Sequence, residues 1–313
     1  MSVAGNKATS EKLEPPLEPR AAPVAGPWVG VPETRRVRPT WVEPDVGRRV
    51  AKPFIKWAGG KRKLVPHLLR YVPQHIRAYH EPFVGGGALF YELKPSVAYL
   101  TDANERLVRT YRGVRDDVDG VIHRLGAYPH DQEFYLKFRR KDVDVGRDAD
   151  VAAWLIYLNK TGFNGLYRVN RKNEFNVPFG SHTNPTICDE ENLRACARLL
   201  RRTDVALDDF TGVLKRARRG DFVYFDPPYM PLSVSSSFVS YTKGGFGPED
   251  HRRLRDVALA LKRKGVTVLL SNSSHPLIRE LYAEHFIIEE VMAARAINSR
   301  ADRRGPVREL LIR

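Results

Sequence analysis

Hydrophobic positions follow a regular order along the chain from about Pro53 onward. Short apolar runs that are typical of buried strands occur at 78–84, 97–102, 204–209, 221–226 and 266–272. Longer segments between them predict helices at 88–93, at 104–115 with Asn104 as the cap, at 151–159, and at 248–265 between Pro248 and Gly265. This alternation predicts an α/β sheet, and the last two apolar runs, 285–293 and 307–313, predict a terminal antiparallel pair.

Two segments depart from this order. Residues 1–50 hold eight of the 22 prolines and almost no apolar periodicity, which predicts an extended, disordered tail. Residues 160–187 are rich in Asn, Gly, Arg and aromatic side chains, which predicts a long irregular loop. Long loops inside a compact domain are usually functional, so the second segment is a candidate binding region.

Composition narrows the class of protein without deciding it. A hydrophobic content of 42% can build a core, and no stretch approaches the ~20 apolar residues of a membrane span. The N-terminus lacks the pattern of a secretory signal, and Cys188 and Cys196 suggest neither a disulfide framework nor a metal site. We therefore expect a cytoplasmic protein in which both cysteines are small hydrophobic side chains of one helix. The formal charge of +15 favours a polyanionic partner, although an arginine-rich proteome would give the same balance.

A glycine turn follows the first predicted strand, in "EPFVGGGALF" (81–90). Its consecutive glycines match neither the dinucleotide fingerprint nor the phosphate loop of nucleotide hydrolases, and a tight turn alone would explain them. Asp102 ends the next predicted strand, 15 residues after Gly87. Since neighbouring parallel strands end at one edge of a sheet, Asp102 and the turn are expected side by side, where a carboxylate can bind ribose hydroxyls. The pair predicts an adenosine-type ligand.

The sequence "DPPY" (226–229) ends another predicted strand at the same edge. The Asp226 carboxylate and the Pro227 carbonyl are both acceptors, and together they could hold the two hydrogens of an exocyclic amine. Tyr229 offers a flat face for the ring that carries the amine. A rigid turn with a solvated aspartate is the alternative, and the nearby glycine turn favours the functional interpretation.

Four motifs together resemble one known family, the Dam-type DNA adenine-N6 methyltransferases. They are "FIKWAGGK" (54–61), "EPFVGGGALF", "LNKTGFNGLYRVNRKNEFNVPFG" (158–180) and "DPPY", and the resemblance covers residues 52–313. It implies an α/β fold: a Rossmann-like S-adenosylmethionine-dependent methyltransferase sheet with a small, mainly helical target-recognition insertion. The implied division is a tail at 1–50, a catalytic domain at 51–115 and 203–313, and a DNA target-recognition domain at 116–202.

The same resemblance assigns site residues by motif. It implies cofactor contacts with S-adenosylmethionine from Trp57, Lys61, Glu81, Phe83, Gly85, Asp102 and Asp226. It implies catalytic roles for Asp226, Pro227 and Tyr229, and contacts with double-stranded DNA from Lys56, Asn164, Leu166, Arg168 and Pro178. From the residues alone, core packing is the favoured interpretation for Trp57 and a solvated charge the favoured one for Lys61, although Trp57 can stack and Lys61 can meet a carboxylate.

The implied reaction is methyl transfer to N6 of an adenine that is flipped out of a short duplex site, with GATC as the implied sequence. One departure bears on that sequence, because Ser181 and His182 follow "VPFG" where the Dam pattern commonly has Arg and Tyr. A cognate restriction endonuclease is a possible partner. The Ser- and Gly-rich segment 233–246 is expected to be a mobile flap, and "SNSSH" (271–275) either lines the pocket or caps the next helix.

Two other functions stay open at this point. One is an amino-methyltransferase that acts on cytosine N4 or on a glutamine side chain, but the aspartate at the first position of "DPPY" and the long insertion argue against both. A non-catalytic DNA-binding relative would be expected to carry a broken glycine or "DPPY" motif, and both are intact. Cytosine C5 methylation needs a catalytic cysteine, and neither cysteine lies in such a motif.

Overall fold

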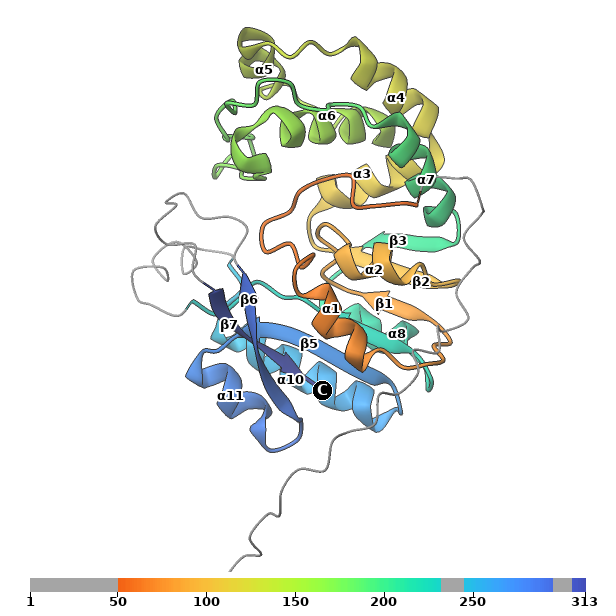
Figure 1. Cartoon of the computed structure of the whole chain (residues 1–313), viewed down its shortest axis with the longest axis vertical. Coiled ribbons are helices and arrows are strands. Elements are labelled where there is room, and N and C mark those ends of the chain that lie inside the picture. The colour runs from red at the N-terminus through yellow and green to blue at the C-terminus, as the bar shows by residue number, and fades with distance from the viewer. Residues whose placement is uncertain (1–49, 232–244, 295–305) are drawn as a thin grey trace, which may run out of the picture. The chain divides into compact units, whose positions relative to one another are not determined.

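A computed structural model describes residues 50–231, 245–294 and 306–313 of the chain (Figure 1). These residues all belong to one compact unit, Arg38–Arg313. Residues 1–49 and 232–244 lie outside the described residues, so the expected tail and most of the expected flap are not part of this description.

A seven-stranded sheet forms the centre of the described part of the chain, in the order β3-β2-β1-β4-β5-β7-β6. The strands are β1 (Tyr79–Glu81), β2 (Ala98–Asp102), β3 (Thr203–Leu207), β4 (Phe222–Phe225), β5 (Thr267–Ser273), β6 (Ile288–Ala294) and β7 (Pro306–Ile312). The first five strands in this order are parallel, while β7 runs antiparallel to both β5 and β6. The predictions of five internal strands, a terminal antiparallel pair and an α/β sheet are confirmed.

Strand β4 shows why the sheet is buried on both faces. Its side chains alternate between two hydrophobic clusters, with Phe222 and Tyr224 in one and Val223 and Phe225 in the other. On the first side the sheet meets α2 (Ala88–Leu93) and α3 (Glu105–Asp116). On the second side it meets α8 (Val213–Arg216), α10 (Pro248–Arg263) and α11 (Pro276–Ala283).

Four further helices, α4 to α7, form a layer that packs on α3 (Figure 1). They are α4 (Val118–Ala127), α5 (Gln132–Phe138), α6 (Asp148–Thr161) and α7 (Glu190–Leu200). Helix α6 is apolar almost all round because it lies at the centre of this layer, where Trp154 and Tyr157 are fully buried. The prediction of an apolar helix at 151–159 is confirmed, and so is the Asn104 cap, whose Oδ1 accepts the Leu107 N–H at 3.1 Å.

Short helical turns and one irregular loop complete the described chain. The turns are α1 (Val65–Leu68), η1 (Leu69–Tyr71), η2 (Phe163–Gly165) and η3 (Phe210–Gly212). The predicted irregular loop at 160–187 is confirmed, since beyond the end of α6 it holds only η2 and two isolated bridges, Gly162 with Phe179 and Val169 with Phe175.

One local prediction was wrong. Cys188 and Cys196 do not share a helix, because α7 begins only after Asp189, whose carboxylate accepts the Asn192 N–H at 3.3 Å and caps the helix. Cys188 is half-buried ahead of this cap, and Cys196 is buried inside α7.

Candidate active site

Polar side chains gather where four neighbouring strands end. Glu81 ends β1, Asp102 ends β2, Asp226 follows β4, and Ser271 lies in the second half of β5. These strands are adjacent and parallel in the order β2-β1-β4-β5, so their carboxyl ends share one edge. That edge is the usual ligand side of an open parallel sheet.

The glycine turn after β1 lies directly against Asp102 and Trp57. The Gly85 N–H donates to Asp102 Oδ2 at 3.2 Å, and the Asn104 N–H donates to Oδ1 at 2.9 Å. Gly85 has a φ of 46°, and a Cβ at this position would lie 2.7 Å from Trp57 Cδ1, so only glycine lets the indole pack here. Burial raises the pKa of Asp102, and its bonds to backbone N–H groups offset part of that rise.

Asp226 is paired with Lys61, whose side chain is only 7% exposed. Lys61 Nζ lies 2.8 Å from Asp226 Oδ1, and the Ser271 hydroxyl donates to the same oxygen at 3.0 Å. Burial raises the pKa of Asp226, while Lys61 and Ser271 act in the opposite direction. The carboxylate that Lys61 meets in the structure is therefore that of Asp226.

The turn after Asp226 is held by the two strands on its far side. The Tyr229 hydroxyl donates to Glu309 Oε2 at 2.8 Å, and Glu309 lies on β7. The Met230 N–H donates to Asn272 Oδ1 at 3.3 Å, and Ser273 Oγ donates to the Met230 carbonyl at 2.6 Å. One face of the Tyr229 ring is occupied, because Lys61 Nζ lies 4.4 Å from its centroid.

Three residues near the end of the sheet add to the sequence analysis. The prediction that "SNSSH" caps the next helix is confirmed, since His275 Nδ1 accepts the Leu277 N–H at the start of α11, and Ser271 in the same segment donates to Asp226. Glu309 was not singled out, because nothing in the terminal strand shows that it pairs with β5 as well as with β6.

Glu81 and Phe83 lie in different surroundings. Glu81 is 3% exposed and accepts a bond from the Tyr79 hydroxyl at 2.9 Å, and burial raises its pKa well above the ordinary value. Phe83 is half-buried, and its ring stacks on Phe210 with centroids 5.5 Å apart. Sequence reasoning missed Phe210, although it follows the end of β3 as closely as the glycine turn follows β1.

Asn159 connects the first motif to the long loop. Its Oδ1 accepts the Lys56 N–H at 2.8 Å, and its Nδ2 donates to the carbonyls of Lys56 at 2.8 Å and Gly165 at 2.7 Å. Asn159 is 2% exposed, so this clamp is internal, while the Lys56 side chain reaches the surface. Nothing in the sequence distinguishes Asn159 from the other residues of its motif.

The four loop residues expected to contact DNA lie on one connected segment. The Phe163 N–H donates to the Pro178 carbonyl at 2.9 Å, which brings Pro178 beside Asn164 in η2. Arg168 is exposed, and its Nε and Nη2 donate to Asn176 Oδ1 and the Asn176 carbonyl at 2.7 and 2.9 Å. Leu166, which lies between Asn164 and Arg168 in the sequence, is half-buried. The structure thus brings Lys56, Asn164, Leu166, Arg168 and Pro178 together around one loop.

Comparison with known proteins decides the family. The family model of D12 class N6 adenine-specific DNA methyltransferases matches residues 57–297. The chain belongs to this family. It is therefore an adenine-specific DNA methyltransferase, and the Dam-type resemblance and the Rossmann-like methyltransferase sheet expected from the sequence are confirmed.

The similarity extends over most of this D12-class chain. It is 43% identical over 269 residues to the type II methyltransferase M1.LlaDCHI of Lactococcus lactis subsp. cremoris, which covers 83% of this chain and 94% of that protein. It is 40% identical over 284 residues to the type II methyltransferase M.MjaIII of Methanocaldococcus jannaschii, with 83% and 98% covered. The DNA adenine methylase of Escherichia coli strain K12 is 33% identical over 262 residues, with 82% and 93% covered.

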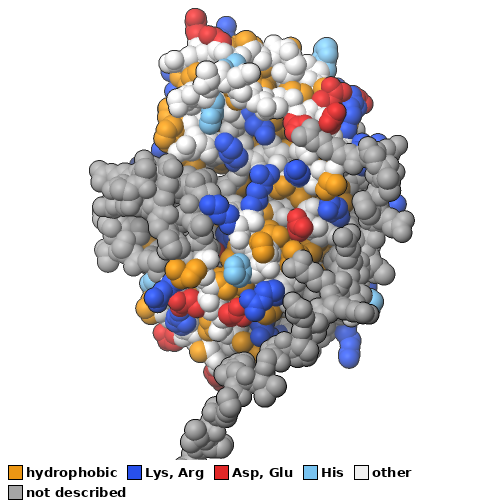
Figure 2. Space-filling model, viewed as in Figure 1, with side chains coloured by type: hydrophobic (Ala, Val, Ile, Leu, Met, Phe, Trp, Pro, Cys, Tyr) orange, Lys and Arg blue, Asp and Glu red, His pale blue; other side chains and the backbone are white. Residues whose placement is uncertain are grey.

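A DNA methyltransferase of this class needs a basic surface, and one face of the molecule provides it. Lys and Arg side chains gather over the centre of this face, with few acidic side chains among them (Figure 2). Burial has the largest effect on Lys160 and lowers its pKa. The nearby positive charges of Lys56 and Arg62 lower it further, so the three basic side chains lie close together. Such a cluster attracts phosphates.

In residues 50–231, 245–294 and 306–313, no group of three or more His, Cys, Asp or Glu side chains could hold a metal ion. No helix in these ranges is long and apolar enough to cross a membrane.

Proposed function

We propose that this D12-class enzyme transfers a methyl group from S-adenosylmethionine to N6 of an adenine that is flipped out of a duplex GATC site. The observation that carries the proposal is the placement of Asp226 and Pro227 at the end of β4, next to the strand whose glycine turn bonds to Asp102. An amine acceptor pair and an adenosine-type site thus share one edge of the sheet.

The residues present fit S-adenosylmethionine, the donor that methyltransferases of this kind generally use. Gly85 keeps the turn open for a close approach, and Asp102 sets a buried carboxylate beside it for ribose hydroxyls. Phe83, which is half-buried and stacks on the buried Phe210, supplies aromatic surface next to the turn, and Trp57 lies on the other side of the turn. When bound, the cofactor supplies an electrophilic methyl group, so the chain needs no nucleophile of its own.

Asp226 and Pro227 hold the acceptor amine in this proposal. Lys61 and Ser271 both bind Oδ1 of Asp226, so this proposal assigns the amine to Oδ2. Oδ2 and the Pro227 carbonyl can then accept the two N6 hydrogens, which takes the nitrogen lone pair out of conjugation with the ring. Holding the lone pair toward the methyl donor is a contribution of position and orientation.

The flipped base also needs an aromatic surface. Extrusion costs a few kcal/mol of stacking, part of which a protein ring can return. The bond from the Tyr229 hydroxyl to Glu309 fixes this ring beside Asp226, and the face that Lys61 does not cover can take the base.

Sequence reading falls to the loop at 160–180 in this proposal. Asn164, Leu166, Arg168 and Pro178 face base edges, and Lys56 contributes to the basic surface beside them. Ser181 and His182, which stand where the Dam pattern commonly has Arg and Tyr, are both exposed. GATC remains the proposed recognition sequence despite this departure. Residues 116–202 would then be the target-recognition domain, and residues 51–115 and 203–313 the catalytic domain.

Two expectations about the cellular setting belong to the same proposal. Two of the relatives are named type II methyltransferases, which supports a role in restriction–modification with a cognate restriction endonuclease. The two-cysteine composition and the DNA substrate support action in the cytoplasm.

The test is methylation of an unmethylated plasmid with S-adenosylmethionine. Digestion with an endonuclease that N6-methyladenine blocks at GATC, followed by sequencing that detects N6-methyladenine, is expected to show protection and modified adenines at GATC alone. Modified adenines in another sequence would show that the enzyme recognises that sequence and not GATC. Modified cytosine N4 would contradict the reaction, and cofactor binding by calorimetry with no methyl transfer to any DNA would indicate a non-catalytic relative.

Lys61 should control the pH at which the enzyme loses activity. Only ionised Asp226 can hold the target amine in this way. Because burial raises the pKa of Asp226, lowering the pH should reduce turnover at a higher pH than it would for an ordinary aspartate. Lys61→Met removes the cation that favours the carboxylate, so the acid limb of kcat should move further up, by roughly 1–3 pH units. The measurement is kcat against pH at saturating cofactor and DNA, with Lys63→Met, an exposed neighbour, as the control. An acid limb that stays in place or moves down would contradict the role of Lys61.

A further inference from the structure

Residues 168–176 form a small hairpin, called here the recognition hairpin. The Asn176 N–H donates to the Arg168 carbonyl at 3.0 Å, and the Asn170 N–H donates to the Glu174 carbonyl at 2.9 Å. The Asn170 side chain closes the turn, since its Oδ1 accepts the N–H groups of Lys172 and Glu174 at 2.9 and 3.0 Å. These bonds order the hairpin internally, and the buried Phe175, whose ring centroid lies 5.6 Å from that of Trp154, holds its second strand on the core. The tip and the first strand need a separate attachment.

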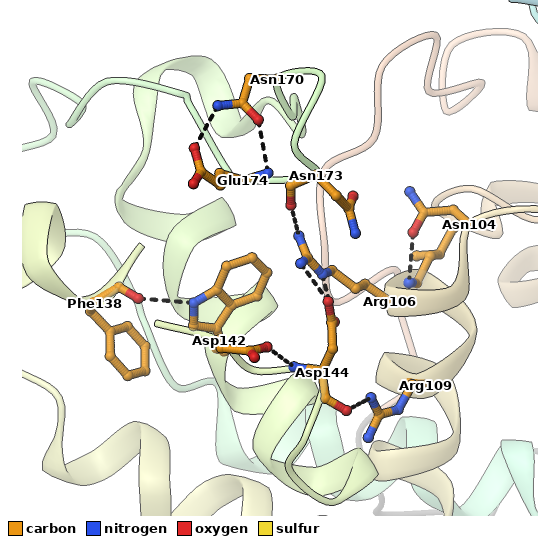
Figure 3. A network of polar contacts seen from close by, with 11 residues as sticks. Asn104, Arg106, Arg109, Phe138, Asp142, Asp144, Asn170, Asn173 and Glu174 are labelled. Carbon is orange, nitrogen blue, oxygen red and sulfur yellow. Dashed lines mark hydrogen bonds and ion pairs between the residues drawn. The ribbon is translucent and has the colours of Figure 1, made fainter. Parts of the chain in front are cut away.

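Arg106 on α3 supplies an external attachment (Figure 3). Its Nη1 donates to the Asn173 carbonyl at 2.8 Å, at the tip of the hairpin. Its Nε and Nη2 donate to the two carboxylate oxygens of Asp144 at 2.8 and 2.7 Å. The guanidinium also lies 5.2 Å from the Trp154 ring centroid, and the side chain is 10% exposed. A buried, bidentate arginine has a fixed geometry, so the carbonyl that it binds is fixed as well.

The same arginine lies at a second attachment, just before the hairpin. The Tyr167 ring stacks on Trp57, with centroids 5.2 Å apart and planes 24° apart. Burial raises the pKa of the Tyr167 hydroxyl, and the nearby positive charge of Arg106 partly offsets this rise. Arg168 therefore lies between a side chain close to Arg106 and a carbonyl that Arg106 binds.

We propose that Arg106 is a positioning residue for sequence reading, which holds the recognition hairpin on α3 so that Arg168 meets its base in one orientation. The inference rests on the proposed role of Arg168 in GATC recognition. Its sequence context, "NERLV", shows only a helical arginine, and the partners Asp144 and Asn173 are 38 and 67 residues away.

The chain offers a matched control on the same helix. Arg109 is also largely buried, and it donates to Asp148 Oδ1 at 2.7 Å and to the carbonyls of Asp144 and Gly146 at 2.8 and 2.5 Å. It therefore resembles Arg106 in burial and in bonding to the 144–148 loop, but none of these bonds reaches the hairpin.

The first measurement needs neither DNA nor cofactor. Amide hydrogen exchange in residues 168–176 of the full chain is expected to be about tenfold faster in Arg106→Gln, since the hydrogen bond from this charged group to the hairpin is lost. Arg109→Gln should leave exchange in this segment as in the wild type. Equal exchange in Arg106→Gln and wild type, or equal acceleration in both variants, would overturn the proposal.

The second measurement addresses reading. The ratio of kcat/KM on a GATC duplex to that on each single-base variant should fall about tenfold in Arg106→Gln, with the KM for cofactor unchanged. If Arg106→Gln does not fold, Arg106→Lys replaces it in the experiment. Lysine keeps the positive charge beside Asp144 but lacks the guanidinium group that also reaches Asn173, so the same tenfold fall in discrimination is expected. A loosened hairpin with unchanged discrimination would overturn the reading role. If the wild type does not methylate GATC, the proposed function fails, while the exchange result still decides whether Arg106 holds the hairpin.

Discussion

Replacing Asp226 with alanine should lower kcat by about 100- to 1,000-fold, because one of the two acceptors that hold the target amine is lost. Binding of DNA should largely survive, since the phosphate contacts come from basic residues elsewhere on the surface. Turnover with labelled cofactor, DNA binding by anisotropy and folding by circular dichroism test this expectation together. Near-normal turnover in a folded Asp226→Ala protein would refute the assignment.

The Lys61 pair requires a second variant. Lys61 is 7% exposed, so Asp226→Ala leaves a nearly buried ammonium group without its carboxylate and should also lower stability. Asp226→Asn keeps one oxygen, which can accept from Ser271 or from the amine, but it replaces the other oxygen with an NH2 group and removes the charge. Its kcat should lie between those of the wild type and Asp226→Ala, whereas a loss as large as that of alanine would show that the charge itself carries the effect.

Replacing Arg168 with alanine should relax one guanine position of the target by roughly 1–3 kcal/mol of discrimination. Asn176 binds the Nε and Nη2 of this guanidinium, which leaves the Nη1 side for the O6 and N7 of guanine. The measurement is the methylation rate on the GATC duplex and on each single-base variant at two salt concentrations.

Lys172 gives the comparison, because it is exposed in the same hairpin and its backbone N–H, not its side chain, bonds to Asn170. If Lys172 touches phosphate, Lys172→Ala should slow all duplexes alike and flatten the salt dependence. Should Arg168→Ala slow every duplex by one common factor, Arg168 is a phosphate contact, and the reading role passes to Asn164 or Pro178.

Local signals in the sequence determined most of the sheet and its site edge. Apolar runs placed five strands, and Asn104, Pro248 and Gly265 marked helix ends, because strand burial and capping depend on a few neighbouring residues. Parallel strands end at one edge of a sheet, so the sequence alone placed Asp102 and Asp226 near the glycine turn. The cap at Asp189 was overlooked, which is why Cys188 was wrongly assigned to a helix.

Contacts between distant segments were decided only by the tertiary structure. Lys61 pairs with Asp226, Tyr229 with Glu309, and Arg106 with Asp144 and Asn173, across separations that no periodicity or motif spacing encodes. A lysine, a glutamate or a helical arginine looks the same in sequence whether it is solvated or buried against a partner. Which one occurs depends on how β7 inserts beside β5 and how α3 packs under the loop, and these are properties of the whole packed chain.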